Sequence, residues 1–178
     1  MDKQAQWRVR PATREDAAAL ALIGAATFLE TFSGILDGDA IIAHCERAHS
    51  RAAYEAYLDA GAQAWLAEIE PGHAPIGFAL ASTPDLAAAR PGDWELKRIY
   101  ALSRFHGSGL GAALMQAAVA AAAPYQRLLL GVYARNARAI AFYRKQGFEP
   151  IAERQFDVGG KLYDDLVLAR PLAESITA

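Results

Sequence analysis

The segment that most constrains this fold lies in mid-chain, where a strand meets closely spaced glycines and then a helix. Trp94–Leu102 has extended-chain character, Gly107, Gly109 and Gly111 follow, and an Ala-rich helix is predicted over Gly109–Ala123. Glycines allow a tight turn and the close approach of a ligand to the backbone. The unpaired amides that begin the helix point at one spot, where the helix dipole favours an anion. The pattern predicts an anion-binding turn; a glycine-rich turn without a ligand is the alternative.

Two familiar phosphate-binding motifs do not fit this turn. A Walker A loop needs Gly-Lys-Ser/Thr, which does not follow here. Residues 107–112 do match the G-x-G-x-x-A pattern of dinucleotide-binding folds, but that pattern also needs an acid about 20 residues further on. No Asp or Glu occurs between Lys97 and Phe148. The sequence therefore argues against a Rossmann oxidoreductase.

Charge is distributed unevenly along the chain. The 178 residues include 18 Lys+Arg and 20 Asp+Glu, a formal net charge of -2. The acid-free stretch holds eight of the bases, so the remainder has ten bases and 20 acids. If the two parts are segregated in space, the basic part favours a polyphosphorylated cofactor and the acidic part a cation. The bases of the stretch are Lys97, Arg98, Arg104, Arg127, Arg135, Arg138, Arg144 and Lys145.

Length and composition exclude several other classes of protein. A chain of 178 residues with 53% hydrophobic residues is long enough for one domain with a substantial core, which we expect to span residues 1–178. This composition excludes a disordered chain, and the near-neutral charge argues against a DNA-binding protein. The single cysteine, Cys45, excludes an internal disulfide framework. The first residues contain no apolar segment, and no apolar run reaches the ~18 residues of a membrane span, so we expect a soluble, cytoplasmic protein.

Hydrophobic periodicity and turn residues predict the element order βααβββαβαββ, an α/β (α+β) layered fold. The second helix is predicted over residues 40–60, and Asn136 and Gly147 suit the two ends of a helix over 137–146. Asp157-Val158-Gly159-Gly160 predicts a closing hairpin. The strands are predicted at 7–10, 64–70, 76–82, 94–102, 128–133, 151–156 and 162–169.

A second motif, Asn136–Phe148, follows the turn by about 20 residues. Together the two segments resemble the GCN5-related N-acetyltransferases (GNAT family), whose second signature is Asn-x-x-Ala-x-x-Phe-Tyr-x-x-x-Gly-Phe. The match is loose at Ile140 and direct at Asn136, Phe142, Tyr143, Gly147 and Phe148. The resemblance spans nearly the whole chain. It implies a mixed, mostly antiparallel sheet flanked by helices and transfer of an acetyl group from acetyl-CoA to a primary amine.

The resemblance also implies roles for individual residues. Asn136 would hydrogen-bond the cofactor, Lys145 would reach a CoA phosphate, and Tyr143 would be the general acid. His106 stands where the family usually has Gln or Arg, and because the phosphate contacts are mostly main-chain, we expect binding to survive. The backbone of Ile99, Tyr100 and Ala101 would pair with the pantetheine arm, and amides of His106, Gly107, Ser108, Gly109, Leu110, Gly111 and Ala112 would cradle the pyrophosphate.

The chemistry of acetyl transfer supports two catalytic assignments. A tyrosine with a pKa of ~10 is a reasonable proton donor to a departing thiolate, whose thiol has a pKa of ~8.5, which suits Tyr143. An alkylammonium acceptor, with a pKa of ~10.4, must lose a proton before it attacks. Glu95 is the last acid before the basic stretch and lies on the strand expected beside the thioester, so we predict that it is the base. A surface glutamate is the alternative.

The acceptor is the least constrained part of the prediction. Phe28, Glu30 and Phe32, at the end of the first helix, are predicted to contact it, and they resemble the polyamine-acetylating branch of the family. We therefore expect a small-molecule amine such as a polyamine, with a protein N-terminus or lysine as the alternative acceptor. A non-catalytic acyl-CoA-binding domain is the alternative function. We expect no metal, because His44 and His49 are poorly spaced for two ligands on one helix face, and no nucleic-acid or membrane partner; a homodimer stays open.

Overall fold

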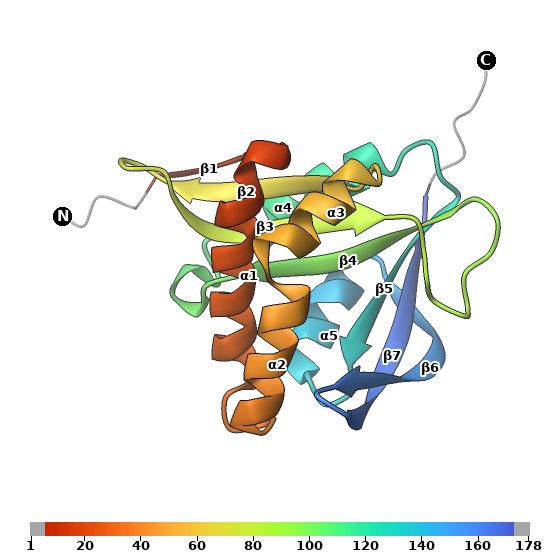
Figure 1. Cartoon of the computed structure of the whole chain (residues 1–178). Helices are drawn as coiled ribbons and strands as arrows, with labels where there is room; N and C mark the ends of the chain where they lie inside the picture. The colour runs from red at the N-terminus through yellow and green to blue at the C-terminus, as the bar shows by residue number, and fades with distance from the viewer. Residues whose placement is uncertain (1–5, 173–178) are drawn as a thin grey trace, which may run out of the picture.

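Seven strands form one sheet in the order β1-β2-β3-β4-β5-β7-β6 in the computed structural model, which describes residues 6–172 (Figure 1). Strands β4 and β5 are parallel and every other neighbouring pair is antiparallel. The sheet is thus mixed and mostly antiparallel, as predicted. The strands are β1 (Trp7–Pro11), β2 (Gln63–Ile69), β3 (Ala74–Ser82), β4 (Asp93–Ala101), β5 (Arg127–Tyr133), β6 (Glu149–Val158) and β7 (Lys161–Pro171).

Helices cover both faces of the sheet (Figure 1). On one face lie α1 (Ala17–Phe32), α2 (Gly38–Ala48) and α3 (Arg51–Asp59); on the other lie α4 (Leu110–Ala121) and α5 (Ala137–Lys145). Two short 3-10 helices, η1 (Arg14–Asp16) and η2 (Ser103–Phe105), precede α1 and α4. Among the described residues, no helix is both long and apolar enough to cross a membrane.

The prediction of one helix over residues 40–60 is wrong, because the chain breaks there into α2 and α3. Ser50 has an extended backbone (φ -79°, ψ 156°), and its side chain accepts a hydrogen bond from the Ala53 amide at 3.1 Å. This is an N-cap, which begins a new helix instead of continuing the old one. The break places the buried His49 at the junction, where its ring lies 5.5 Å from that of Phe28 in α1.

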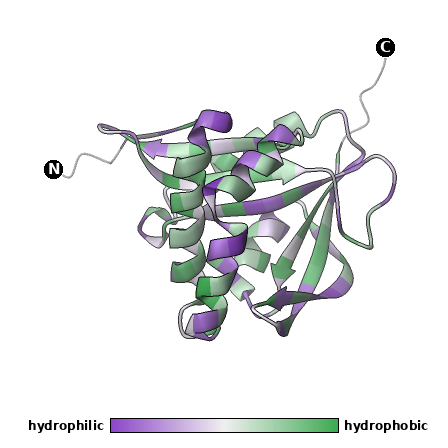
Figure 2. Cartoon of the chain, in the orientation of Figure 1, coloured by the Kyte–Doolittle hydropathy of each residue, from purple (hydrophilic) through white to green (hydrophobic). Residues whose placement is uncertain are grey.

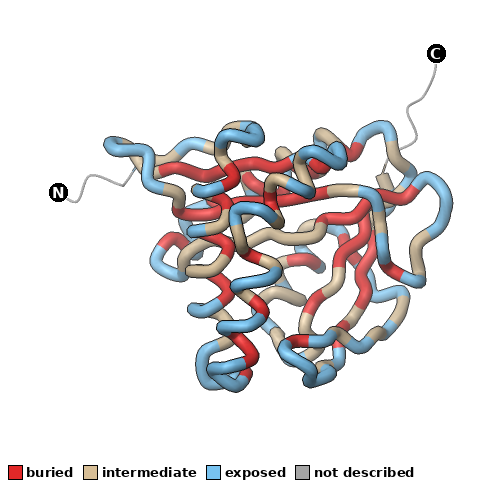
Figure 3. Tube along the Cα trace, viewed as in Figure 1, coloured by how far each residue is buried: buried red, intermediate tan, exposed pale blue. Residues whose placement is uncertain are grey.

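The hydrophobic core has one large layer on each face of the sheet. Figure 3 shows that the buried residues run along the middle strands, and Figure 2 shows hydrophobic residues gathered at the same positions. On the α4 side the layer includes Trp94, Leu96, Leu114, Met115 and Phe148. On the α1 side it includes Leu20, Ile23, Tyr54, Phe78 and Leu80. Alternating strand residues supply the two layers, as expected for a sheet covered on both faces.

Strands β4 and β5 stay paired for only three residues and then diverge (Figure 1). Their register joins Asp93 to Arg127, Trp94 to Leu128 and Glu95 to Leu129. At the paired end, the Arg127 guanidinium donates two hydrogen bonds to Asp93, at 2.9 and 2.6 Å. Beyond Glu95 the two strands separate. The sheet therefore has an opening in its middle, and this opening positions the site.

A β-bulge in β4 changes which side chains face this opening. Leu80 of β3 pairs with Arg98 and Ala81 pairs with Leu96, so Lys97 is an extra residue. Leu96 before the bulge and Ile99 after it both pack on the α4 side, so the alternation of the strand shifts by one residue there. Lys97 and Arg98 consequently both lie on the face covered by α1–α3.

Candidate active site

A cavity of about 690 Å³ occupies the opening between β4 and β5 and extends to both faces of the sheet. Most residues predicted for the site line it, whereas Ser108, Leu110 and Lys145 do not. The predicted residues that line it are Phe28, Glu30, Phe32, Glu95, Ile99, Tyr100, Ala101, His106, Gly107, Gly109, Gly111, Ala112, Asn136 and Tyr143. Segments far apart in the sequence are thus brought to one place.

The glycine turn presents unpaired amides to the cavity. Gly107 and Gly109 have φ of 80° and 87°, a left-handed conformation that glycine adopts readily, and Gly109 is the N-cap of α4. Among the described residues, no hydrogen-bond acceptor is found for the amides of Gly107, Gly109, Gly111 and Ala112. These are donors of the kind that bind anions.

The other predicted members of the turn have local roles. The amides of His106 and Ser108 donate to the carbonyls of Ser103 and Phe105. The Ser108 hydroxyl also donates to the Phe105 carbonyl, at 2.6 Å, which closes the turn. The Leu110 side chain is fully buried in the layer under α4. The free donors therefore come from only part of the predicted stretch.

Backbone groups of β4 face the opening at alternate residues. The Leu102 amide donates to Ile76 of β3, and in an antiparallel ladder every second residue faces the same neighbour. Tyr100 therefore pairs with β3, whereas the backbone groups of Ile99 and Ala101 face the opening. His106 Nε2 lies 2.9 Å from the Ala101 carbonyl oxygen. That oxygen has a second lone pair for another donor.

Helix α5 contributes its N-terminal end to the cavity. Asn136 Oδ1 caps the helix by accepting from the Ala139 amide at 3.1 Å, which leaves the side-chain NH₂ of Asn136 for a ligand. Arg138 lines the cavity and Lys145 does not. At 1.5 Å per residue, Lys145 lies roughly 13 Å further along the helix from Asn136. Arg138 was not predicted as a site residue, although its place in the same turn as Asn136 was a usable signal.

Tyr143 lies within the cavity wall and is 8% exposed. Its ring centroid is 5.5 Å from that of Phe142 and 6.0 Å from that of Phe148. Burial raises the pKa of Tyr143 well above its usual value, and the Tyr100 phenol adds to this effect. The hydroxyl therefore stays protonated at neutral pH, which is the state that a proton donor needs.

Glu95 is buried, at 3% exposure, and faces the cavity from the other side. Its Oε2 accepts from the Asp85 amide at 3.0 Å and from Lys97 Nζ at 2.7 Å, and the same ammonium lies 2.9 Å from Asp85 Oδ2. Burial raises the pKa of Glu95, opposed by Lys97 and by the Asp85 amide. Asp85 lies in the connection before β4 and was not predicted to belong to the site.

Aromatic rings of α1 and α2 form the wall opposite β4. The Phe28 ring lies 4.6 Å from Phe32 and is stacked on His44 at 4.3 Å. Burial, assisted by the charge of Arg98, lowers the pKa of His44 to about 4 and that of His49 to about 3. Both imidazoles are therefore neutral at pH 7. Within residues 6–172, no group of three or more His, Cys, Asp or Glu side chains is placed to hold a metal ion.

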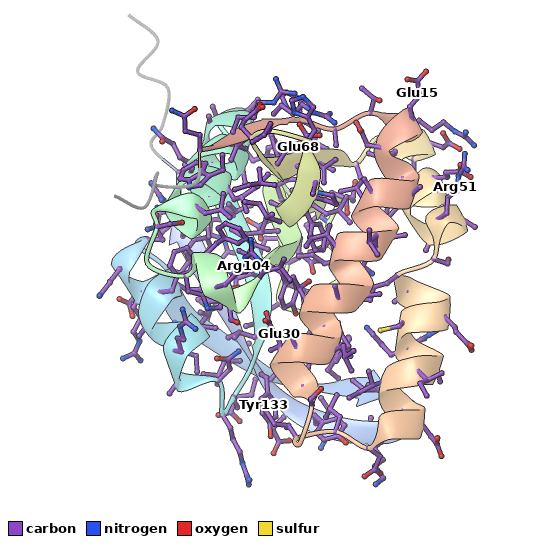
Figure 4. The ribbon with its side chains drawn as sticks, turned by 90° about the vertical axis from the view of Figure 1, so that its left-hand side faces the viewer. Glu15, Glu30, Arg51, Glu68, Arg104 and Tyr133 are labelled. Atoms are coloured by element: carbon purple, nitrogen blue, oxygen red, sulfur yellow. The ribbon has the colours of Figure 1, made fainter. Side chains whose placement is uncertain are left out.

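Glu30 has a binding partner of its own. Its carboxylate accepts from the amide and the hydroxyl of Ser103, at 2.8 and 2.7 Å. Figure 4 shows Glu30 on the side of α1 that faces η2 and Arg104. The contact ties the end of α1 to the segment that leads into the glycine turn.

Comparisons with known proteins agree with this architecture. A sequence profile described as "Acetyltransferase (GNAT) family" matches residues 29–148. An uncharacterized N-acetyltransferase of Mycobacterium tuberculosis is 33% identical over 159 residues, which cover 88% of this chain and 98% of that protein.

Solved structures share the fold at lower identity. The PaiA N-acetyltransferase of Thermoplasma acidophilum, in complex with coenzyme A, has a TM-score of 0.74 at 17% identity and covers 93% of this chain and 99% of its own. A ribosomal-protein-alanine N-acetyltransferase of Brucella melitensis has a TM-score of 0.67 at 24% identity, with 93% and 99% covered. The predicted fold class is confirmed. The chain belongs to the GNAT family of acetyltransferases and is an N-acetyltransferase that uses acetyl-CoA as its acetyl donor.

Proposed function

We propose that this enzyme acetylates the primary amine of a small molecule by direct attack on acetyl-CoA within the cavity between β4 and β5. The observation that carries the proposal is the continuity of this cavity. The residues that line it include those of the glycine turn on the α4 side, Tyr143, and Glu95 and the aromatic wall on the α1 side. Donor and acceptor would thus enter from opposite faces of the sheet.

The donor side would hold the CoA part of acetyl-CoA. The amides of Gly107, Gly109, Gly111 and Ala112 would bind the pyrophosphate. The Ile99 and Ala101 backbone would pair with the pantetheine arm, as a strand would. The remaining contacts would come from the Asn136 side-chain NH₂ and from Arg138. Lys145 stays a prediction, and it would reach a phosphate only outside the cavity.

The transfer step divides among a few groups of this chain. The neutral amine attacks the carbonyl carbon of the thioester, so that a C–N bond forms, and a backbone N–H of β4 donates to the developing oxyanion. Collapse of the tetrahedral intermediate formed in this way breaks the C–S bond. Tyr143 donates its proton to the leaving sulfur, and Glu95 accepts the proton of the amine, directly or through water.

The ion pair of Glu95 with Lys97 bears on its role as the base. Lys97 favours the ionised form of Glu95, which a base needs, whereas burial makes that form more basic than an exposed glutamate. The two effects together give an ionised carboxylate with an elevated pKa. A glutamate of this kind is better suited to accept a proton than one in water.

A polyamine acceptor, as expected from the sequence, meets few free carboxylates. Of the carboxylates that line the cavity, Glu30 is hydrogen-bonded to Ser103, Asp85 and Glu95 share Lys97, and Asp165 is paired with Arg154 at 3.3 Å. A protein N-terminus is a second candidate acceptor, favoured by the similarity to a ribosomal-protein-alanine N-acetyltransferase. A cytoplasmic location and a homodimer stay predictions from the sequence.

An acceptor screen tests the proposal. Polyamines, amino acids, aminoglycosides and peptides with free N-termini would be incubated with acetyl-CoA, and the release of free CoA would be followed. We expect turnover with a small amine and its loss in Tyr143→Phe, with acetyl-CoA binding retained. A non-catalytic acyl-CoA-binding domain would instead bind acetyl-CoA and show no turnover with any acceptor.

A further inference from the structure

Arg98 is a half-buried cation without a carboxylate partner in the acceptor part of the cavity. The bulge at Lys97 directs it toward α3, where its guanidinium carbon lies 5.1 Å from the Tyr54 ring centroid and 5.3 Å from that of Tyr57. Arg98 lines the cavity. Its Nη1 is buried without a hydrogen-bond partner, and within residues 6–172 it makes no salt bridge.

The other charged side chains around it are already paired. Lys97 is shared by Glu95 and Asp85, and Arg154 is paired with Asp165. His44 and His49 are neutral at pH 7, as argued above. Of the charged residues that line the cavity from β4, β6 and β7, Arg98 is the one left without an ion pair in the described part of the chain.

A guanidinium nitrogen that is buried without an acceptor is unfavourable unless an anion accepts its hydrogen bonds. The two tyrosine rings compensate for part of its charge but leave Nη1 without an acceptor. The planar fork of arginine matches a carboxylate with two parallel hydrogen bonds. We propose that Arg98 binds a carboxylate of the acceptor, so that the acceptor is an amino acid or a similar amine with an acidic group close to it.

The placement of Arg98 relative to Glu95 agrees with this substrate class. Arg98 pairs with Leu80 and Glu95 with Ser82, so the bulge leaves them two ladder positions apart, which is about 7 Å along the strand. An amino acid that lies along the strand would direct its amine to Glu95 and the thioester, and its carboxylate to Arg98. Its side chain would then lie near the aromatic wall of Phe28 and Phe32. This inference rests on the proposed acetyl transfer.

Matched acceptors test the carboxylate directly. Each common L-amino acid would be compared with its carboxamide, and methionine also with 3-(methylthio)propylamine, which lacks the carboxyl group. Loss of a charge-assisted pair should lower kcat/KM roughly 10–100-fold for the amide relative to the acid. Arg98→Met should abolish that preference while KM for acetyl-CoA stays unchanged. Arg51→Met, an exposed arginine of α3, is the matched control (Figure 4).

The possible failures are distinguishable. If carboxamides react as well as acids, or if Arg98→Met slows both equally, the carboxylate site is wrong and acetyl transfer stands. If no amine is acetylated, the proposed function fails, and calorimetry of N-acetylated amino acids against their amides, with CoA present, decides the carboxylate site separately. In that assay, an equal affinity for acid and amide would overturn the carboxylate site. If Arg98→Met does not fold, Arg98→Gln and Arg98→Lys replace it in the comparison of acids with amides.

Discussion

Replacing Asp93 by asparagine tests whether the ion pair at the closed end of the opening holds β4 and β5 together. Asp93 and Arg127 face each other in the parallel register where the two strands still pair. The Asp93 side chain is 1% exposed and that of Arg127 is 20% exposed. Asp93 also accepts a hydrogen bond from the Arg90 amide at 2.7 Å. The pair thus fixes the strands just before they separate.

The expected loss follows from this geometry. Asparagine keeps the volume and an acceptor for the Arg90 amide, but it loses the charge that two hydrogen bonds from Arg127 share. Breaking a fully buried pair costs about 3–5 kcal/mol, and Arg127 can regain some water through its exposed part. We expect Asp93→Asn to lower the free energy of unfolding by about 2–4 kcal/mol. For a chain of this length that is a fall in Tm of roughly 5–15 °C.

Urea unfolding followed by tryptophan fluorescence measures the loss, because Trp94 is next to the pair and stacks on Tyr125. The hydrogen bond from Arg127 lowers the pKa of Asp93, so its stabilisation is present above the unfolded pKa of about 3.9 and is lost as pH falls through the lower folded value. The difference between wild type and variant should therefore be smaller at pH 3 than at pH 7.

A matched variant controls for charge removal alone. Asp59→Asn breaks the exposed Arg14–Asp59 pair and should leave the unfolding midpoint unchanged. The Asp93–Arg127 pair does not hold the strands together if Asp93→Asn stays within about 0.5 kcal/mol of the wild type at pH 7, or if its loss is the same at both pH values.

Three further substitutions test the site itself. Tyr143→Phe should lower kcat about 10²–10⁴-fold with acetyl-CoA affinity unchanged by calorimetry, and an unchanged kcat would reject Tyr143 as the acid. The wild-type kcat/KM should fall as pH drops through the pKa of Glu95, which burial raises above 4.5. Glu95→Gln should lower turnover and lack this fall of kcat/KM at acid pH. An identical pH dependence of kcat/KM in wild type and variant would exclude Glu95 as the base. Gly109→Ala places a side chain at φ 87°, which should cost about 1–2 kcal/mol and raise KM for acetyl-CoA. Gly61→Ala, at φ 91° and outside the cavity, should show the stability loss alone; an equal rise in KM would contradict a role of the turn in binding.

Local signals account for what the sequence predicted well. The positions of the strands along the chain, the glycine turn and the ends of α5 depend on short stretches of chain, such as the Asn136 cap and Gly147 with its φ of 84°. Ser50 was also a local signal. It was overlooked because the apolar pattern continues from α2 into α3 without a glycine or proline between them.

The rest depends on contacts between distant segments. Asp85 belongs to the site only because the connection before β4 folds back over Glu95. Arg98 faces the cavity only because Leu80 and Ala81 pair across an extra residue. The residues of a strand specify neither its partner nor its register, so an element order that was wrong only at the α2–α3 break still left the charges of the acceptor pocket unassigned.

The bulge in β4 has a consequence for how this pocket can diversify. Without Lys97, the strand would alternate regularly, with Trp94, Leu96, Ile99 and Ala101 in one layer and Glu95, Arg98 and Tyr100 toward the other. Loss of that one codon would thus leave both hydrophobic layers in phase but remove the ammonium that Glu95 and Asp85 share. A one-residue deletion at this point would therefore spare the core and change the charge beside Glu95.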